Sequence, residues 1–287
     1  MADRLKFPFI LVKHIEWWSG IFKFQYSSNT SLLFWVFNQS IGTWLIIILF
    51  LQLRTNKNSQ ALSSLTFAYS SWAVFGMIPI SLASIFHDGR KFKSVLTFQN
   101  IAVPIMIGVF YGIFYLSSNG SVSTSMSGFT LKKFEDFVLY AFFILTEFGI
   151  FFLIMGRKAM SYNFYYIVLA ELLLIPLYVI VAYDFIMRAS IPALFILMTF
   201  LIKFLLDDNN KTKKIILVIV MIIEAATPII EINRSIGVTL LRTWQGRRSE
   251  LLREEIHSYG DISTKQLLSY HFFIPDYEHS IFYKISR

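Results

Sequence analysis

Acidic and basic side chains inside the most hydrophobic part of the chain are the first residues whose types and spacing could do chemistry. Asp184 and Arg188 lie four positions apart, between two apolar stretches of residues 164–206. If this junction is helical, the i, i+4 spacing lets the two side chains pair on one face. If the helix breaks there, Arg188 is free to hold a phosphate, because its guanidinium fork matches that anion. A third reading is a self-satisfied turn that only joins two helices.

Other charged residues interrupt long apolar runs: Glu147, Glu171, Lys203 and Glu224. One interpretation is a polar cavity that handles a charged substrate or protons. The alternative is that Lys203 pairs with a glutamate on a neighbouring helix while the other charges sit at a membrane interface. Because one lysine cannot neutralise every glutamate of this set, the pattern favours a hydrated interior or shifted pKa values.

Amide and aromatic residues gather near the start of the chain. The residues that could contact a sugar or a lipid headgroup are Gln25, Asn29, Trp35, Asn38 and Gln39. Amides in hydrocarbon need hydrogen-bond partners, so these residues face a hydrated cavity, a ligand or another helix. The same composition also fits an ordinary hydrogen bond between helices.

The composition restricts the class of protein. Hydrophobic residues make up 55% of the 287 residues and charged residues only 15%, whereas a soluble domain has about 25% charged residues. The net charge of +8 comes from lysines and arginines between the apolar segments, with no continuous basic patch for nucleic acid. The chain has no cysteine, and no pair of its five histidines has the HExxH spacing. No metal, cofactor or nucleic acid is therefore expected.

These features predict an all-α, polytopic integral membrane bundle. The length rule of roughly 20 apolar residues per helix gives about seven spans, at residues 32–53, 62–86, 96–116, 137–155, 164–187, 190–206 and 215–232. The expected organisation is an interfacial N-terminal segment (1–30), the transmembrane bundle (31–232) and a polar C-terminal tail with a surface helix (233–287). The serine-rich residues 117–133 are expected to form a flexible surface loop. The charges of alternate loops nearly balance, so no orientation follows.

Three short blocks of sequence resemble part of a known group of proteins. The first runs from Trp17-Trp18 through Gln25-Tyr26-Ser27-Ser28-Asn29-Thr30, Leu33-Phe34-Trp35 and Asn38-Gln39 to Gly42-Thr43-Trp44. The second is residues 184–194 (DFIMRASIPAL), and the third is residues 276–284 (DYEHSIFYK). Together they resemble the C-terminal half of bacterial polytopic membrane proteins that look like C-type (GT-C) glycosyltransferases.

This resemblance implies a function in the bacterial cytoplasmic membrane. It implies transfer of sugars from polyprenyl-phosphate carriers during assembly of the cell-envelope glycan. Such enzymes carry a catalytic acidic residue in an early extracytoplasmic loop, and no loop of this chain is its equivalent. Phe37 also stands where the resemblance leads us to expect proline. No catalytic residue is assigned, and a second membrane subunit is an expected partner, beside the lipid bilayer and a polyprenyl-phosphate lipid.

The first functional hypothesis is therefore a glycosyltransferase-like membrane protein or subunit. In this hypothesis the amide and aromatic residues contact sugar or headgroup, while Asp184 and Arg188 orient a phosphate or an acceptor. The second hypothesis is a transporter or flippase with a polar cavity lined by Glu147, Glu171 and Glu224. The third is a non-catalytic subunit of a membrane complex.

Overall fold

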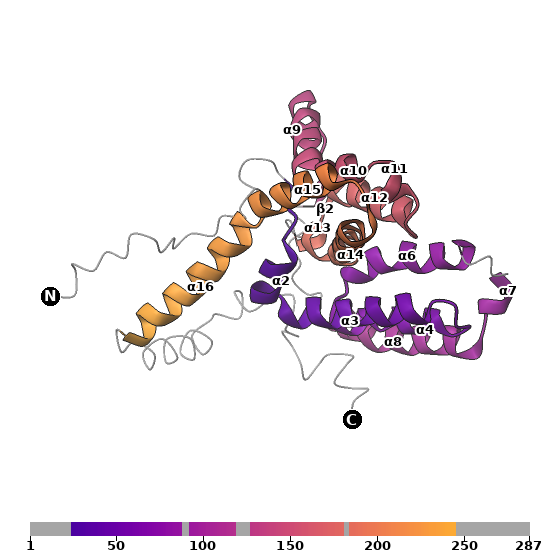
Figure 1. The fold of residues 1–287 in the computed structure, drawn as a ribbon. Coiled ribbons are helices and arrows are strands. Elements are labelled where there is room, and N and C mark those ends of the chain that lie inside the picture. Colours follow the sequence, from indigo (N-terminus) through magenta and orange to yellow (C-terminus); the bar gives the residue numbers. More distant parts are fainter. Residues whose placement is uncertain (1–23, 88–91, 119–126, 181–183, 245–287) are drawn as a thin grey trace.

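The computed structural model describes residues 24–87, 92–118, 127–180 and 184–244, and these residues are mostly helical (Figure 1). The all-α expectation is confirmed. The elements in chain order are α2 (Asn29–Trp35), α3 (Phe37–Leu53), α4 (Ser59–Ser64), α5 (Thr66–Tyr69), α6 (Ala73–His87), α7 (Phe92–Val95), α8 (Phe98–Ser118), β1 (Gly128–Phe129), α9 (Phe134–Ile144), η4 (Leu145–Gly149), α10 (Ile150–Met155), α11 (Arg157–Met160), α12 (Tyr165–Leu174), η5 (Ile175–Leu177), β2 (Tyr178–Val179), α13 (Asp184–Ala189), α14 (Ile191–Asp207), α15 (Lys211–Glu224) and α16 (Ala226–Trp244).

Helix α14 is the centre around which the other helices pack (Figure 1). It contacts α2, α3, α6, α11, α12 and α13. Apolar residues occur on all sides of this helix, and a helix that is hydrophobic all round is a buried one. Pro192 lies in the first turn of α14. Proline is tolerated there because the backbone N–H groups of a first turn make no hydrogen bond within the helix.

Residues 24–28, which belong to the segment expected to be interfacial, form an extended stretch that is mostly buried against the helices. Phe24 packs on Tyr140 and Phe143, with ring centroids 5.4 Å apart in both pairs. The Tyr26 hydroxyl donates a hydrogen bond of 2.7 Å to the carbonyl of Leu172. Non-helical backbone is tolerated at such depth only where protein surrounds it or where it lines a cavity. Residues 1–23 of the expected interfacial segment lie outside the described residues.

The expected span at residues 62–86 is not one helix. It is divided among α4, α5 and α6, and the backbone of Ser70 is extended at the last break. Hydroxyl groups explain these breaks, since serine side chains compete with the helix for backbone hydrogen bonds. The Ser70 hydroxyl accepts a hydrogen bond from the Ala73 N–H at the start of α6. The Ser63 hydroxyl donates to the Gln60 carbonyl at 2.7 Å.

The expected span at residues 164–187 is also interrupted. Helix α12 ends at Leu174, and Pro176, which has no backbone N–H to continue the helix, lies in the short 3-10 turn η5. Strand β2 then pairs antiparallel with β1. Thr130 ties the two segments together, because its N–H donates to Leu177 and its hydroxyl donates to Pro176. This end of the serine-rich segment is therefore packed against the break, and residues 119–126 lie outside the described residues.

The last expected span, 215–232, is divided between α15 and α16 at Ala225. Helix α16 then continues to Trp244, so the boundary expected at residue 233 does not coincide with a helix end. In Figure 1, α16 extends away from the other helices. The surface helix expected in the C-terminal tail falls mainly in residues 245–287, outside the described residues.

Two helical stretches are long and apolar enough to cross a membrane, among the residues that the structure describes. They are Phe134–Met155, with 22 residues, and Lys211–Gly237, with 27 residues. The first joins α9, η4 and α10, and the second joins α15 and part of α16. The other apolar helices are shorter, so the expected number of about seven spans stays a prediction.

Candidate functional site

Asp184 and Arg188 form the pair that their spacing predicts. The Arg188 Nη2 and the Asp184 Oδ2 are 3.2 Å apart on one face of α13, and the side chains are 12% and 28% exposed. Phe185, between them in the sequence, packs edge-on against Trp72 and Phe75, with centroids 5.6 and 5.9 Å away. Residues 184–189 of this junction are therefore helical, and Phe185 anchors α13 to the start of α6.

The amide and aromatic residues near the start of the chain contact different neighbours. Gln25 is buried in the extended segment, and Asn38 is exposed, with its side-chain Oδ1 accepting a hydrogen bond from the Gln39 N–H. The Asn29 amide donates to the sulfur of Met198 on α14 at 3.7 Å. Buried Gln39 accepts a 3.2 Å hydrogen bond from the Ser70 hydroxyl, and Trp35 donates to α16. These residues therefore do not meet at one point.

Several buried polar atoms of residues 27–44 have no hydrogen-bond partner within the described part of the chain. They are Ser27 Oγ, Asn29 Oδ1, Thr43 Oγ1 and Trp44 Nε1. The Trp44 ring stacks on Phe195, with centroids 5.7 Å apart, while Asn29 contacts Met198. Positions 195 and 198 are neighbours on one face of a helix. Asn29 and Trp44 therefore converge on the same face of α14.

Sequence reasoning missed Ser27, Thr43 and Trp44 as site residues, although all of them lie in the first block of the resemblance. Hydroxyl and indole groups are common in apolar helices, and nothing in their spacing distinguishes a satisfied group from an unsatisfied one. A buried polar group without a partner costs about 1–3 kcal/mol. Unpartnered hydroxyl, amide and indole groups on residues 27–44 are therefore candidates for hydrogen bonds with something other than the described chain.

Glu171 is the most deeply buried of the acidic residues singled out from the sequence. Its side chain lies on α12, the residue is 6% exposed, and neither carboxylate oxygen has a partner among the described residues. It is next to Leu172, whose carbonyl binds the Tyr26 hydroxyl. A carboxylate without a partner in such surroundings is costly unless it is protonated, hydrated or bound to a ligand.

Glu147 interacts electrostatically with Glu224, at the end of α15, and Glu147 and Glu171 both interact with Tyr26. Glu147 lies in η4, a π-helical turn between α9 and α10. Single π turns inside α-helices occur often at functional sites. Glu147 therefore lies within electrostatic range of Glu224 and of Tyr26.

Lys203 does not neutralise these glutamates by an ion pair within the described residues. Its ammonium group lies 5.2 Å from the ring centre of Tyr162, a cation–π geometry. Burial, together with the carboxylates of Asp207 and Asp208, raises the pKa of the Tyr162 hydroxyl above its ordinary value. Tyr162 is therefore neutral at physiological pH, and Lys203 belongs to the end of α14 rather than to the acidic cluster.

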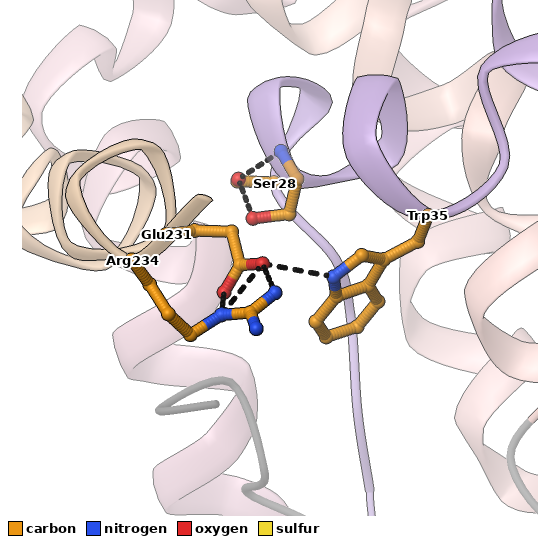
Figure 2. A network of polar contacts seen from close by, with 5 residues as sticks. Ser28, Trp35, Glu231 and Arg234 are labelled. Atoms are coloured by element: carbon orange, nitrogen blue, oxygen red, sulfur yellow. Dashed lines mark hydrogen bonds and ion pairs between the residues drawn. The ribbon is translucent and has the colours of Figure 1, made fainter. Parts of the chain in front are cut away.

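A polar network missed by the sequence analysis holds α16 against α2 (Figure 2). Glu231 is 3% exposed, and its carboxylate accepts hydrogen bonds from the Arg234 Nε at 3.2 and 3.1 Å. The Trp35 indole donates to the same carboxylate at 3.3 Å. Nearby, Ser28 caps α2 by accepting from the Ser31 N–H at 3.1 Å. The i, i+3 spacing of Glu231 and Arg234 is visible in the sequence, but their contact with Trp35 is not.

Among the described residues, no group of three histidine, aspartate or glutamate side chains is placed to hold a metal ion. Comparison of the chain with protein-family models, curated proteins and solved structures found no match.

Proposed function

We propose that this chain is a polytopic protein of the bacterial cytoplasmic membrane, with about seven spans. It handles a polyprenyl-phosphate-linked sugar in assembly of the cell-envelope glycan, as a glycosyltransferase-like protein or as a subunit beside a second membrane protein. Broad apolar exposure supports a location in lipid: Phe98 and Phe134 are 80% and 82% exposed. Large exposed apolar surface marks a contact with lipid or protein.

The observation that carries the proposal is the group of unpartnered polar atoms on residues 27–44. It combines hydroxyl, amide and indole groups with an aromatic face. Sugar hydroxyls both donate and accept, so they can satisfy such a mixed set without adding net charge. The same residues belong to the block that resembles GT-C proteins. In this proposal Asp184 and Arg188, paired on α13, orient the carrier phosphate or the acceptor.

Replacing Thr43 by valine should separate function from stability. Valine has nearly the shape of threonine but lacks the hydroxyl group, so its burial leaves no unsatisfied polar atom. We expect the melting temperature in detergent to stay level or rise, reflecting a gain of up to about 1–3 kcal/mol, while cell-envelope glycan made by the host falls strongly. Mass spectrometry of the glycan and thermal unfolding of the purified variant measure the two effects.

Thr66 provides a matched control on another element. It lies in α5, is fully buried, and its hydroxyl also has no partner within the described residues. Thr66→Val should therefore stabilise the protein similarly but leave the glycan unchanged. Wild-type glycan in Thr43→Val, or an equal loss in both variants, would argue against a sugar site on residues 27–44.

A second candidate function is proton-coupled transport, which the buried carboxylate of Glu171 favours. Glutamine at this position keeps the shape but cannot release a proton. If the protein transports protons with a substrate, Glu171→Gln should reduce proton flux at least about tenfold, since the obligatory carrier group is gone. A pH-sensitive dye inside proteoliposomes measures the flux after an imposed gradient. Glu135→Gln, at an exposed position at the start of α9, is the control. No flux in the wild-type protein eliminates this candidate.

A further inference from the structure

A cavity of about 420 Å³ lies between α4, α6 and α8, on the part of the bundle away from α9 and α16. Its volume falls in the range of sites for small ligands, roughly 300–1,000 Å³. Phe67, Met77, Leu82 and Pro104 are among the apolar residues of its wall. None of the residues proposed above to contact sugar or protons lines it.

The polar residues of this wall already have hydrogen-bond partners. The Gln60 amide bonds to the hydroxyls of Ser81 and Ser84. The Ser63 hydroxyl donates to the Gln60 carbonyl, and the Ser64 hydroxyl donates to the Ala61 carbonyl, each at 2.7 Å. Each of these polar side chains therefore has a partner within the protein, and a hydrocarbon chain fits the mainly apolar wall better than a polar molecule does.

The cavity opens on an apolar face of the bundle. Ile78, Leu82, Leu96 and Ile101 all line the cavity, and they are also 46–54% exposed. Wall residues that are exposed in this way form the edge of the opening rather than its floor. In a membrane, this edge faces lipid, so the hydrocarbon chain of a neighbouring lipid can enter from the side.

Two lysines lie on the segments that meet at one end of the cavity. Asn100 lines this end, and its amide group donates to the carbonyls of Lys57 and Val95 at 2.6 and 2.7 Å. Lys57 and Lys93, on the two segments that Asn100 joins, are exposed. Residues 54–64 and 92–101 contain no aspartate or glutamate. A negatively charged headgroup at this end would therefore meet lysines and no carboxylate from these segments.

We propose that the cavity binds one acyl chain of an anionic phospholipid, with the headgroup beside Lys57 and Lys93. The site depends on the membrane location contained in the proposed function, but not on the glycan role. Bound lipid would fill the space between α4, α6 and α8 and stabilise their packing.

Two glycines of α8 allow a direct test. A Cβ atom at Gly108, which lines the cavity, would meet no described atom within 4 Å, and the same holds for Gly112, which does not line it. Native mass spectrometry in micelles with phosphatidylglycerol measures lipid bound to the full chain. Leucine at position 108 adds bulk at the wall of the cavity, so Gly108→Leu should weaken binding by about tenfold or more. Gly112→Leu should bind as the wild type does.

The headgroup assignment has its own test. Phosphatidylcholine with identical acyl chains serves as the neutral competitor. In the double variant Lys57→Gln, Lys93→Gln, the ratio of phosphatidylglycerol binding to phosphatidylcholine binding should fall by about tenfold. Equal binding by Gly108→Leu and Gly112→Leu would overturn the cavity assignment. An unchanged preference in the double variant would overturn the headgroup assignment. Because neither readout involves glycan, failure here and failure of the proposed function are distinguishable.

Discussion

Gly76→Ala should lower the melting temperature of the purified protein by about 5 °C or more. The reason is the crossing of α6 over the junction between α13 and α14. A Cβ atom at Gly76 would lie 2.1 Å from the Ala189 carbonyl oxygen and 3.2 Å from the Pro192 Cδ. Ala189 contributes backbone, which cannot move aside as a flexible side chain can. Overpacking of this kind costs about 1–3 kcal/mol or more, and a few degrees are lost for each kcal/mol.

Gly112→Ala is the matched control for this crossing. It adds the same methyl group to another helix, at a position where no described atom lies within 4 Å of the new Cβ. Alanine favours a helix over glycine by about 0.5–1 kcal/mol, so the control should be neutral or slightly stabilising. Thermal unfolding in one detergent measures both variants. Equal melting temperatures for the two variants would show that α6 is not in such close contact with α13 and α14.

Glu231→Ala should release α16 from α2. The variant removes the carboxylate that joins Arg234 to the Trp35 indole. Breaking a buried ion pair costs about 3–5 kcal/mol. Arg234 is 19% exposed and keeps some hydration, so we expect about 2–3 kcal/mol here. Helix α16 makes few contacts with elements other than α15 and α2. Few other contacts therefore remain to hold α16 in place once this interaction energy is lost.

Spin labels can measure this release because the chain has no cysteine of its own. Cysteines at Leu33 on α2 and Ile236 on α16 replace exposed residues and carry the labels. The distance distribution should be narrow in the otherwise wild-type protein and broad in Glu231→Ala. Asp184→Ala breaks an intrahelical pair on α13, whose aspartate is 28% exposed, and should leave the distribution narrow. A narrow distribution in Glu231→Ala would mean that apolar contacts alone hold α16.

The helical class was predictable from the sequence because it follows from local properties. Apolar runs with few charges favour helices wherever water is scarce, since a helix satisfies its own backbone. The helix interruptions were harder to predict. Ser70 and Pro176 look like ordinary residues of apolar segments, and membrane helices tolerate both residue types. Whether such a residue bends a helix or ends it depends on its partners, here the α6 backbone for Ser70 and Thr130 for Pro176.

The sequence by itself determined which side chains are expensive to bury. It offered the pairing of Asp184 with Arg188 as one of three readings, and that reading holds because the two residues share one helix. Only the tertiary structure decided which buried groups have partners. Gln39 is satisfied by Ser70, and Trp35 by Glu231, across 31 and 196 positions of the chain. Thr43 and Glu171 have no such partner among the described residues. The physical reason is that a hydrogen bond requires two atoms in contact, and for residues on different helices that contact is fixed by packing around α14.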